Sequence, residues 1–450
     1  MPLPDRIPRW FDALWLTLLA AYILAGAAIA PFHGDESTLI FMGRDFHYLF
    51  VEGDLSQVMY DDTWSTRPTE QKLRLENGTI SKTIYGWLAW NQGFALDDFN
   101  RPWSWGHDYE TNLRRNNVPD AQLLKAARMA SAIQLALAGA IFFQFARITL
   151  NRPTAYVATA LLVMHPNVLI NGRRAMMEGS HLLGLTLVLL AGALLLRERH
   201  WRNYLLLGLC MGLAISAKHP NVLAAALVVL AVAIANCWQS RPKNKRSFVG
   251  AWRPTVWLLP LLIAAALAFL LLNPAWWSAP FELPSVIIEI RSSLLQSQAA
   301  AYNGYDSFLE RLQGLFHIAF AAEHQYFEVA HWSEYDVITE QIRTYESSGL
   351  AGFLIGGSSL VGFVCLLLAG YGAYSIARDS VVGADNRILL LVWAIGTALL
   401  TLLLTPVPWA RYYLPLAPAL AVLVARALVD LYSAMLLRFR RGADGLVVLD

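Results

Sequence analysis

Two adjacent carboxylates, Asp35 and Glu36, are the residues of this chain best suited to chemistry. They follow an apolar run at 11–30 that ends at Pro31. Ionisable groups near the hydrocarbon boundary of a membrane are costly and therefore often functional. A carboxylate there could remove the proton of a hydroxyl as a general base. Since the two acids repel each other and lose hydration, we expect the pKa of at least one to rise toward neutrality. The alternative is a helix cap or a solvated turn.

Four cations could complete a site around these acids. Each lies at one end of an apolar run, and together they could hold an anionic group such as a phosphate: Arg173, Arg174, Lys218 and Arg411. The alternative for each is contact with lipid phosphates at the membrane surface. His219 follows Lys218 and begins the second copy of a His-Pro-Asn-Val-Leu repeat, at 165–169 and 219–223. The prolines of the repeat favour plain helix termination, whereas His219 is a candidate supporting residue.

The elements that position these residues are membrane-spanning helices. With 56% hydrophobic residues, 15% charged residues and a mean hydropathy of +0.42, the composition is typical of an all-α polytopic membrane protein. At roughly 20 apolar residues per crossing, we expect about ten spans in one integral-membrane module covering 1–450. They are placed near 11–30, 123–147, 154–170, 179–196, 203–217, 222–238, 255–272, 351–377, 388–404 and 413–435.

The distribution of Lys and Arg predicts the orientation of the chain in the membrane. Most cations of the short loops lie on the side of both termini, which the positive-inside rule makes cytoplasmic. The first span is expected to be a retained signal anchor. The two long segments, 31–122 with the acidic pair and 273–350, then lie outside, with helices resting on the interface. The four cations lie on this side too, so a site built from them would be extracytoplasmic.

Composition also excludes several classes of function. A net charge of +2 and a pI near 8.4 do not suggest nucleic-acid binding. The three cysteines fall in or beside apolar runs, which argues against a disulfide framework. His33, Asp35, Glu36 and His47 match no closed zinc spacing. We therefore expect no metal site and no required cofactor, although a divalent metal stays open.

These residues, taken together, resemble the GT-C glycosyltransferases. Within that class the chain is similar to the protein O-mannosyltransferases, of glycosyltransferase family 39, and to the bacterial aminoarabinose transferases that act on lipid A. The resemblance covers most of residues 10–435. It is carried by Gly34-Asp35-Glu36, by Leu124 to Arg128 with Ala130-Ser131, by Arg173 to Glu178, by Gly208 to Lys218, and by Arg411 to Pro415, which includes Tyr412.

The resemblance implies roles for individual residues. It implies that Asp35 is the catalytic base of an inverting transfer and that Glu36 orients the acceptor. Arg173 and Glu178 fall on an Arg-x-Ala-x-x-Asp pattern, with Glu in place of Asp. The family's first external loop often carries a His-Pro-Pro-Leu-Gly-Lys-like segment before an aromatic run. Here 77–82 takes its place and only Lys82 matches, followed by Tyr85, so Lys82 joins the expected donor-phosphate ligands and Tyr85 the supporting residues.

The expected activity is transfer of a sugar, mannose or a related one, from a polyprenyl phosphate to a hydroxyl of a protein, lipid or glycan. Cations would stabilise the leaving phosphate, and a single displacement would invert the anomeric configuration. The expected partners are this lipid-linked donor, the hydroxyl acceptor and the bilayer. The alternative is a transporter or flippase for a lipid-linked or small anionic substrate, which should show charges at mid-membrane depth and inverted repeats.

Overall fold

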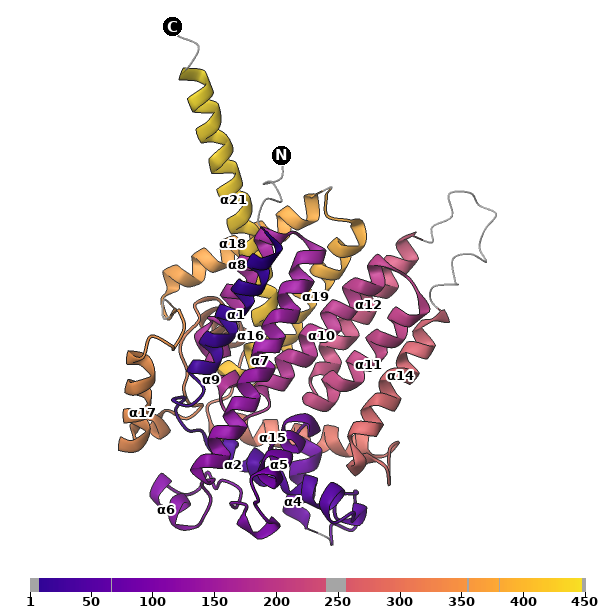
Figure 1. Ribbon diagram of the computed structural model, residues 1–450, viewed down its shortest axis with the longest axis vertical. Helices are drawn as coiled ribbons and strands as arrows, with labels where there is room; N and C mark the ends of the chain where they lie inside the picture. Colours follow the sequence, from indigo (N-terminus) through magenta and orange to yellow (C-terminus); the bar gives the residue numbers. More distant parts are fainter. Residues whose placement is uncertain (1–7, 66, 240–255, 354–355, 380, 447–450) are drawn as a thin grey trace.

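The computed structural model of the chain describes residues 8–65, 67–239, 256–353, 356–379 and 381–446, and these residues form helices and turns without a β-strand (Figure 1). The helices are α1 (Arg9–Ala25), α2 (Gly34–Phe41), α3 (Arg44–Phe46), α4 (Pro68–Glu76), α5 (Thr79–Asn91), α6 (Tyr109–Arg114), α7 (Ala121–Thr149), α8 (Arg152–Val163), α9 (Pro166–Arg173), α10 (Glu178–Arg197), α11 (Trp201–Ala217), α12 (Asn221–Gln239), α14 (Leu258–Leu272), α15 (Leu283–Ala301), α16 (Phe308–Gly314), α17 (Asp336–Ser347), α18 (Ser359–Arg378), α19 (Ala384–Leu404), α20 (Ala410–Tyr413) and α21 (Ala417–Leu446). Short 3₁₀ turns (Leu55–Gln57, Leu96–Asp98, Pro274–Trp276, Ala330–Glu334 and Leu414–Leu416) and π-helical turns (His47–Val51 and Leu315–Phe320) lie between them.

The long apolar helices make this a multi-pass membrane protein. Among the described residues, six helical segments are long and apolar enough to cross a bilayer: α7, α10, α12, α18, α19 and the stretch Ala410–Arg438. A seventh is possible if α8 and α9 form one bent span. The other spans expected from the sequence fall on α1, α11 and α14, which have 15 to 17 residues. The span expected at 351–377 begins as a helix only at Ser359.

Helix α10 forms the centre of the bundle. It is the most deeply buried of the six candidate spans, and it packs against α7, α11, α12 and α19. Glycine allows close packing of two helices here, because a Cβ on Gly184 of α10 would lie 2.7 Å from the Cα of Ala214 in α11. A buried α10 gives a fixed platform for the residues at its first turn, where Glu178 lies.

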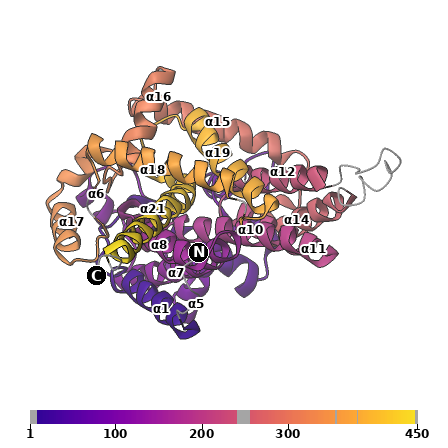
Figure 2. The same cartoon turned by 90° about the horizontal axis from the view of Figure 1, so that it is seen from above.

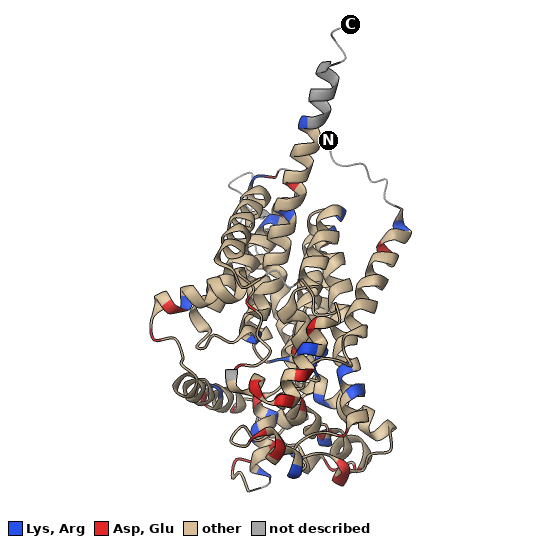
Figure 3. Cartoon of the chain, turned by 90° about the vertical axis from the view of Figure 1, so that its left-hand side faces the viewer, with Lys and Arg blue, Asp and Glu red and all other residues tan. Residues whose placement is uncertain are grey.

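Charged residues gather at one end of the bundle. Helices α2, α4, α5, α6 and α15 lie there, opposite the start of α1 and the end of α21 (Figure 1). Most of the ribbon coloured for Lys, Arg, Asp and Glu lies at this end in Figure 3, whereas the helices above it carry few such residues. Helix α15 runs across the direction of the long spans and lies along the edge of the bundle (Figures 1 and 2). The two long segments 31–122 and 273–350 thus supply the charged end.

A break between α8 and α9 brings a third part of the chain to this end. The two helices meet at His165-Pro166 with a bend of 63°. Proline has no N–H and cannot continue the hydrogen bonding of α8, but it fits the first turn of α9. The bend directs α9, which ends at Arg173, toward α1 and the second long segment, and it brings the following Arg174 to Pro31.

Candidate active site

A cavity of about 560 Å³ lies at the charged end of the bundle. Its walls come from the start of α2, from α4 and α15, from the first turn of α10, and from the segments before α6 and around α20. Charged and aromatic side chains from distant parts of the chain line it: Asp35, Glu76, Trp103, Trp105, Glu178, Lys218, Arg291, Tyr302, Glu328, Trp409, Arg411 and Tyr412. We call it the polar cavity, and Asp35, Lys218 and Arg411 share it.

Asp35 occupies the first turn of α2 and faces the polar cavity. The chain enters this helix through His33, whose Nδ1 accepts a hydrogen bond of 3.1 Å from the Asp35 N–H. The N-terminal end of a helix favours a negative charge, so the position suits an ionised carboxylate. Its Oδ2 contacts the Arg411 guanidinium, and 23% of the side chain stays exposed. Asp35 therefore has both a charged partner and access to a ligand.

Glu328 contacts both Arg411 and His33, two residues that contact Asp35. Its Oε1 lies 3.0 Å from Arg411 Nε, and its Oε2 lies 2.7 Å from His33 Nε2. Because His33 Nδ1 accepts from a main-chain N–H, the neutral ring carries its proton on Nε2 and donates it to Glu328. Burial alone would raise the pKa of Glu328, but the charge of Arg411 and the hydrogen bond from His33 hold it well below the usual range. Glu328 stays ionised and fixes Arg411.

Glu328 is a site residue that the sequence did not indicate. It lies in an aromatic stretch, Tyr326-Phe327-Glu328, of the second long segment. An acid between two aromatic residues and Val329 was the available signal, since an acid in such a stretch is buried only with a partner.

Glu36 is closed off from the polar cavity. It is fully buried and accepts hydrogen bonds from Arg128 Nε at 2.7 Å, Arg128 Nη2 at 2.8 Å, the Ala175 N–H at 2.8 Å and the His33 N–H at 2.9 Å. Burial would raise its pKa, but Arg128 and Arg174 lower it below the ordinary value. The pKa rise expected for the acidic pair is therefore not found at Glu36. The carboxylate cannot orient an acceptor here, because its oxygens are already bonded and it lies outside the cavity wall.

Lys218 and Arg291 supply cations on another side of the polar cavity. Lys218 ends α11 and lies 2.8 Å from Glu178 Oε1 at the start of α10. Arg291 comes from α15, and none of the carboxylates in the described part of the chain lies within ion-pair distance of it. Glu76 faces the same cavity from α4. Burial raises its pKa, and the charges of Lys72 and Arg291 oppose this rise. Arg291 has no distinguishing signal in the sequence, because a lone arginine on an amphipathic helix is typical of a solvated face.

The structure does not bring Arg173 and Arg174 to the polar cavity. Arg173 is fully buried and donates to the carbonyls of Tyr22, Ile23 and Leu350 and to the Tyr345 hydroxyl. Arg174 donates to the Pro31 carbonyl at 2.9 Å, and its guanidinium lies 5.1 Å from the centre of the Phe327 ring. Burial lowers the pKa of Arg174 to about 10, although Glu36 and Glu328 oppose this shift. Arg173 therefore links α9 to α1 and to the second long segment, and Arg174 links the end of α9 to Pro31 and Phe327.

Lys82 and Tyr85 are likewise buried away from the polar cavity. Lys82 Nζ lies 2.8 Å from Asp45 Oδ2, and Arg74 Nε donates to Asp45 Oδ1 at 2.8 Å. Burial would raise the pKa of Asp45, but Lys82 and Arg74 lower it. The Tyr85 hydroxyl donates to the Met176 carbonyl at 2.8 Å. In this structure Lys82 therefore has no access to a donor phosphate from the cavity.

The remaining supporting residues divide between the two environments. Tyr412 lines the polar cavity, donates to Gln298 Oε1 at 2.8 Å and stacks on Trp409 with ring centres 5.6 Å apart. His219 is packed against Phe269 and Trp276 instead. Trp103 also lines the polar cavity and lies against Gly34, where a Cβ would approach the indole to 2.4 Å. Tryptophan faces of this kind could receive a sugar ring.

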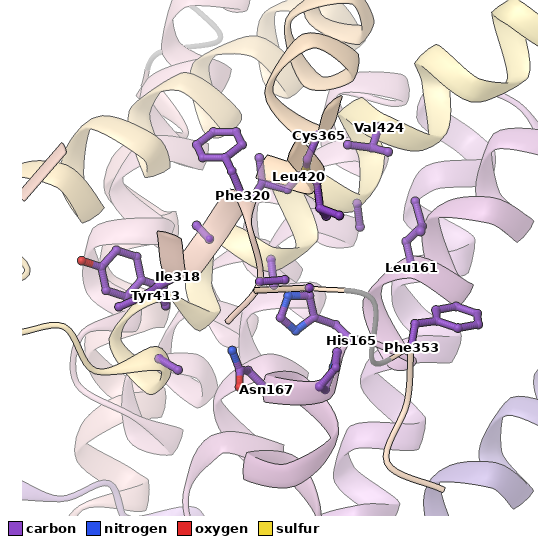
Figure 4. Close-up of a pocket in the computed structure, with 18 of the residues that line it drawn as sticks. Leu161, His165, Asn167, Ile318, Phe320, Phe353, Cys365, Tyr413, Leu420 and Val424 are labelled. Atoms are coloured by element: carbon purple, nitrogen blue, oxygen red, sulfur yellow. The ribbon is translucent and has the colours of Figure 1, made fainter. Parts of the chain in front are cut away.

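A second cavity, of about 400 Å³, lies on the other side of α20 (Figure 4). Almost all its lining is apolar and comes mainly from α18, α21 and the π-helical turn Leu315–Phe320, with Leu161 from α8. His165 and Asn167 from the α8–α9 break and Tyr413 from α20 also line it. We call it the apolar cavity. One short helix, α20, thus directs Arg411 and Tyr412 to the polar cavity and Ala410 and Tyr413 to the apolar one.

Comparison with known proteins shows what this chain is similar to. Residues 70–288 match the family described as dolichyl-phosphate-mannose-protein mannosyltransferase. The fold is similar to that of ArnT from Cupriavidus metallidurans bound to undecaprenyl phosphate, at 12% identity and a TM-score of 0.54 over 94% of this chain and 60% of that one. The chain has the fold of the GT-C glycosyltransferases. The apo oligosaccharyltransferase of Archaeoglobus fulgidus matches this GT-C fold at 12% identity and a TM-score of 0.54, over 99% of this chain and 53% of that one.

These comparisons show the fold of the chain, and the activity has to be inferred from the residues of the site. The chain spans 53% to 60% of the length of the two solved structures. None of the curated protein sequences matches it. The GT-C fold expected from the sequence is confirmed, together with the mostly helical membrane architecture.

Proposed function

We propose that this protein is an inverting glycosyltransferase that moves a sugar from a polyprenyl phosphate to a hydroxyl acceptor at the outer face of the membrane. One observation carries the proposal: Asp35, Arg411 and Lys218, which are more than 180 residues apart in sequence at the closest, line one cavity at the charged end of the bundle. A fold shared with ArnT, which was solved with undecaprenyl phosphate, supports a lipid-linked donor. The family match supports mannose as one candidate sugar.

The first chemical task is to activate the acceptor. As the acceptor oxygen forms a bond to the anomeric carbon, its hydroxyl proton passes to the Asp35 carboxylate. Asp35 is partly exposed to the cavity, whereas Glu36 has no free oxygen, so one carboxylate of the pair acts as the base. A single displacement needs no second carboxylate as nucleophile.

The second task is to stabilise the leaving group. The bond between the anomeric carbon and the phosphate oxygen breaks, and its electron pair remains on the lipid phosphate. Arg411, Lys218 and Arg291 line the cavity and could neutralise this charge. Arg291 is suited to the role because no carboxylate among the described residues pairs with it. Arg173, Arg174 and Lys82, which the sequence also suggested, are bonded elsewhere.

The proposal is tested by assaying the purified protein in lipid nanodiscs against a panel of polyprenyl-phosphate sugars, including mannose and amino-pentose donors. We expect release of polyprenyl phosphate and a glycosylated acceptor with one of these donors, and an inverted anomeric centre by NMR. The Asp35→Asn variant should bind the same donor without turnover. A product with retained configuration would contradict the single displacement. Movement of the lipid across the bilayer without sugar transfer would favour the flippase alternative.

A further inference from the structure

Gln325 connects the two chain segments that supply Arg411 and Glu328. Its side-chain amide accepts a hydrogen bond of 2.6 Å from the Ala410 N–H and donates one of 3.1 Å to the Pro408 carbonyl. Ala410 immediately precedes Arg411, and Gln325 lies three residues before Glu328. A primary amide suits this contact because it offers a donor and an acceptor together.

The two segments and their side chains form a closed ring of contacts. Gln325 joins the main chains at one end of the ring, and the Glu328–Arg411 ion pair joins them at the other. Asn167 in the first turn of α9 fixes Gln325 in turn: it is buried, donates to the Glu323 carbonyl at 2.7 Å, and accepts from the Gln325 N–H at 3.2 Å. The ring is therefore anchored to a helix of the bundle.

The segment before α20 depends on this contact because it has few main-chain donors of its own. Residues 405–409 read Thr-Pro-Val-Pro-Trp, and Pro406 and Pro408 have no N–H. The Ala410 N–H opens α20 and has no partner within that helix. Ala410 and Asn167 also border the apolar cavity (Figure 4), so water is poorly placed to replace a lost hydrogen bond.

We infer that Gln325, held by Asn167, is a positioning residue that fixes Arg411 and Glu328 relative to Asp35 during sugar transfer. The inference rests on the proposed function, since Arg411 is assigned there to the leaving phosphate. Gln325 itself does not line the polar cavity, so it acts through the main chain of residues 408–410. A small displacement of a catalytic group can reduce a rate by up to about 100-fold.

Kinetics of Gln325→Ala in two backgrounds test this role. In the otherwise wild-type protein we expect kcat for transfer to fall about 10-fold to 100-fold, with a much smaller change in the acceptor KM. In an Arg411→Ala background the same substitution should change kcat less than about 2-fold, because the residue through which it acts is absent. Asn167→Ala should act in the same direction with a smaller effect. The control is Gln122→Ala, which changes an exposed glutamine in the first turn of α7 and should leave kcat unchanged.

Hydrogen exchange gives a readout that does not need activity. In Gln325→Ala, peptides covering 406–414 and 321–329 should exchange faster while those of α10 keep their rates. Unchanged exchange in both segments, or an equal loss of kcat with and without Arg411, would overturn the inference. A wild-type protein inactive with every donor would overturn the proposed function and the positioning role with it, and faster exchange would then show only a structural link.

Discussion

Two groups of charged residues at the same end of the molecule differ in the size of the cavity that they border. Around Asp45, Lys82 and Arg74 every charge has a buried partner, and the neighbouring void is only about 10 Å³. Around Asp35 and Arg411 the ion pairs border a cavity of about 560 Å³. Buried pairs fix architecture at a cost in desolvation. An ion pair on a cavity wall can give up one contact and bind a substrate instead. We therefore assign the proposed reaction to the group around Asp35 and Arg411.

The neighbours Asp35 and Glu36 give the largest test of this difference. Asp35→Asn should reduce kcat by about 10²-fold to 10⁴-fold, because the base is lost, while the thermal midpoint stays within a few degrees of wild type. Glu36→Gln should instead destabilise the protein by about 3 kcal/mol, because Arg128 loses a buried carboxylate partner. Transfer rates and thermal melting in the same nanodiscs measure both. If the Asp35→Asn variant is folded and keeps its transfer activity, Asp35 is not the catalytic base.

Two lysines extend the comparison from acids to cations. Lys218→Ala should raise the donor KM about 10-fold and leave the acceptor KM almost unchanged, since it removes a charge from the cavity wall. Lys82→Ala should lower stability by about 3 kcal/mol through Asp45, and the folded fraction should keep its donor KM. Titrations of donor and acceptor, scaled to folded protein, separate the two results. A donor KM that rises in Lys82→Ala would restore this lysine to the phosphate site.

The smallest expected effect is a dependence of stability on pH. The folded pKa of Glu36 lies below its ordinary value of 4.5, so the ionised carboxylate contributes stability that is present above about pH 4.5 and is lost as the pH falls through the folded pKa. The difference in thermal midpoint between wild type and Glu36→Gln should therefore be largest at neutral pH and narrow below pH 4.5. Melting curves from pH 3 to pH 7 record this difference. A gap that is constant across the range would exclude Glu36 as its source.

The sequence predicted the membrane architecture better than the partners of individual charges. Long apolar runs place α7, α10 and α19 within a few residues, because hydrophobic length is a local property. Which of several cations faces a cavity depends on contacts between distant segments. Arg173 and Lys218 look alike in sequence, as cations at the ends of apolar runs. Only the packing of α9 against α1 separates them, since it surrounds Arg173 with carbonyl oxygens.

The same limit explains the residues that were missed. Glu328 and Gln325 lie in a segment without apolar periodicity, and their importance comes from Arg411 and Ala410, more than 80 residues away. No local pattern encodes such a pair. Arg291 is similar, because α15 contributes to the site only by lying across the ends of other helices (Figure 1).

The capped start of α2 has a consequence for how substrate preference could change. The backbone of α2 sets the orientation of Asp35, and His33 and Glu36 cap the first turn of this helix. The tryptophans that line the same cavity, Trp103, Trp105 and Trp409, come from irregular stretches of chain. Substitutions among those aromatic residues could therefore reshape the volume offered to a new sugar or alcohol without redirecting the carboxylate, which makes this half of the pocket the natural place to begin redesign.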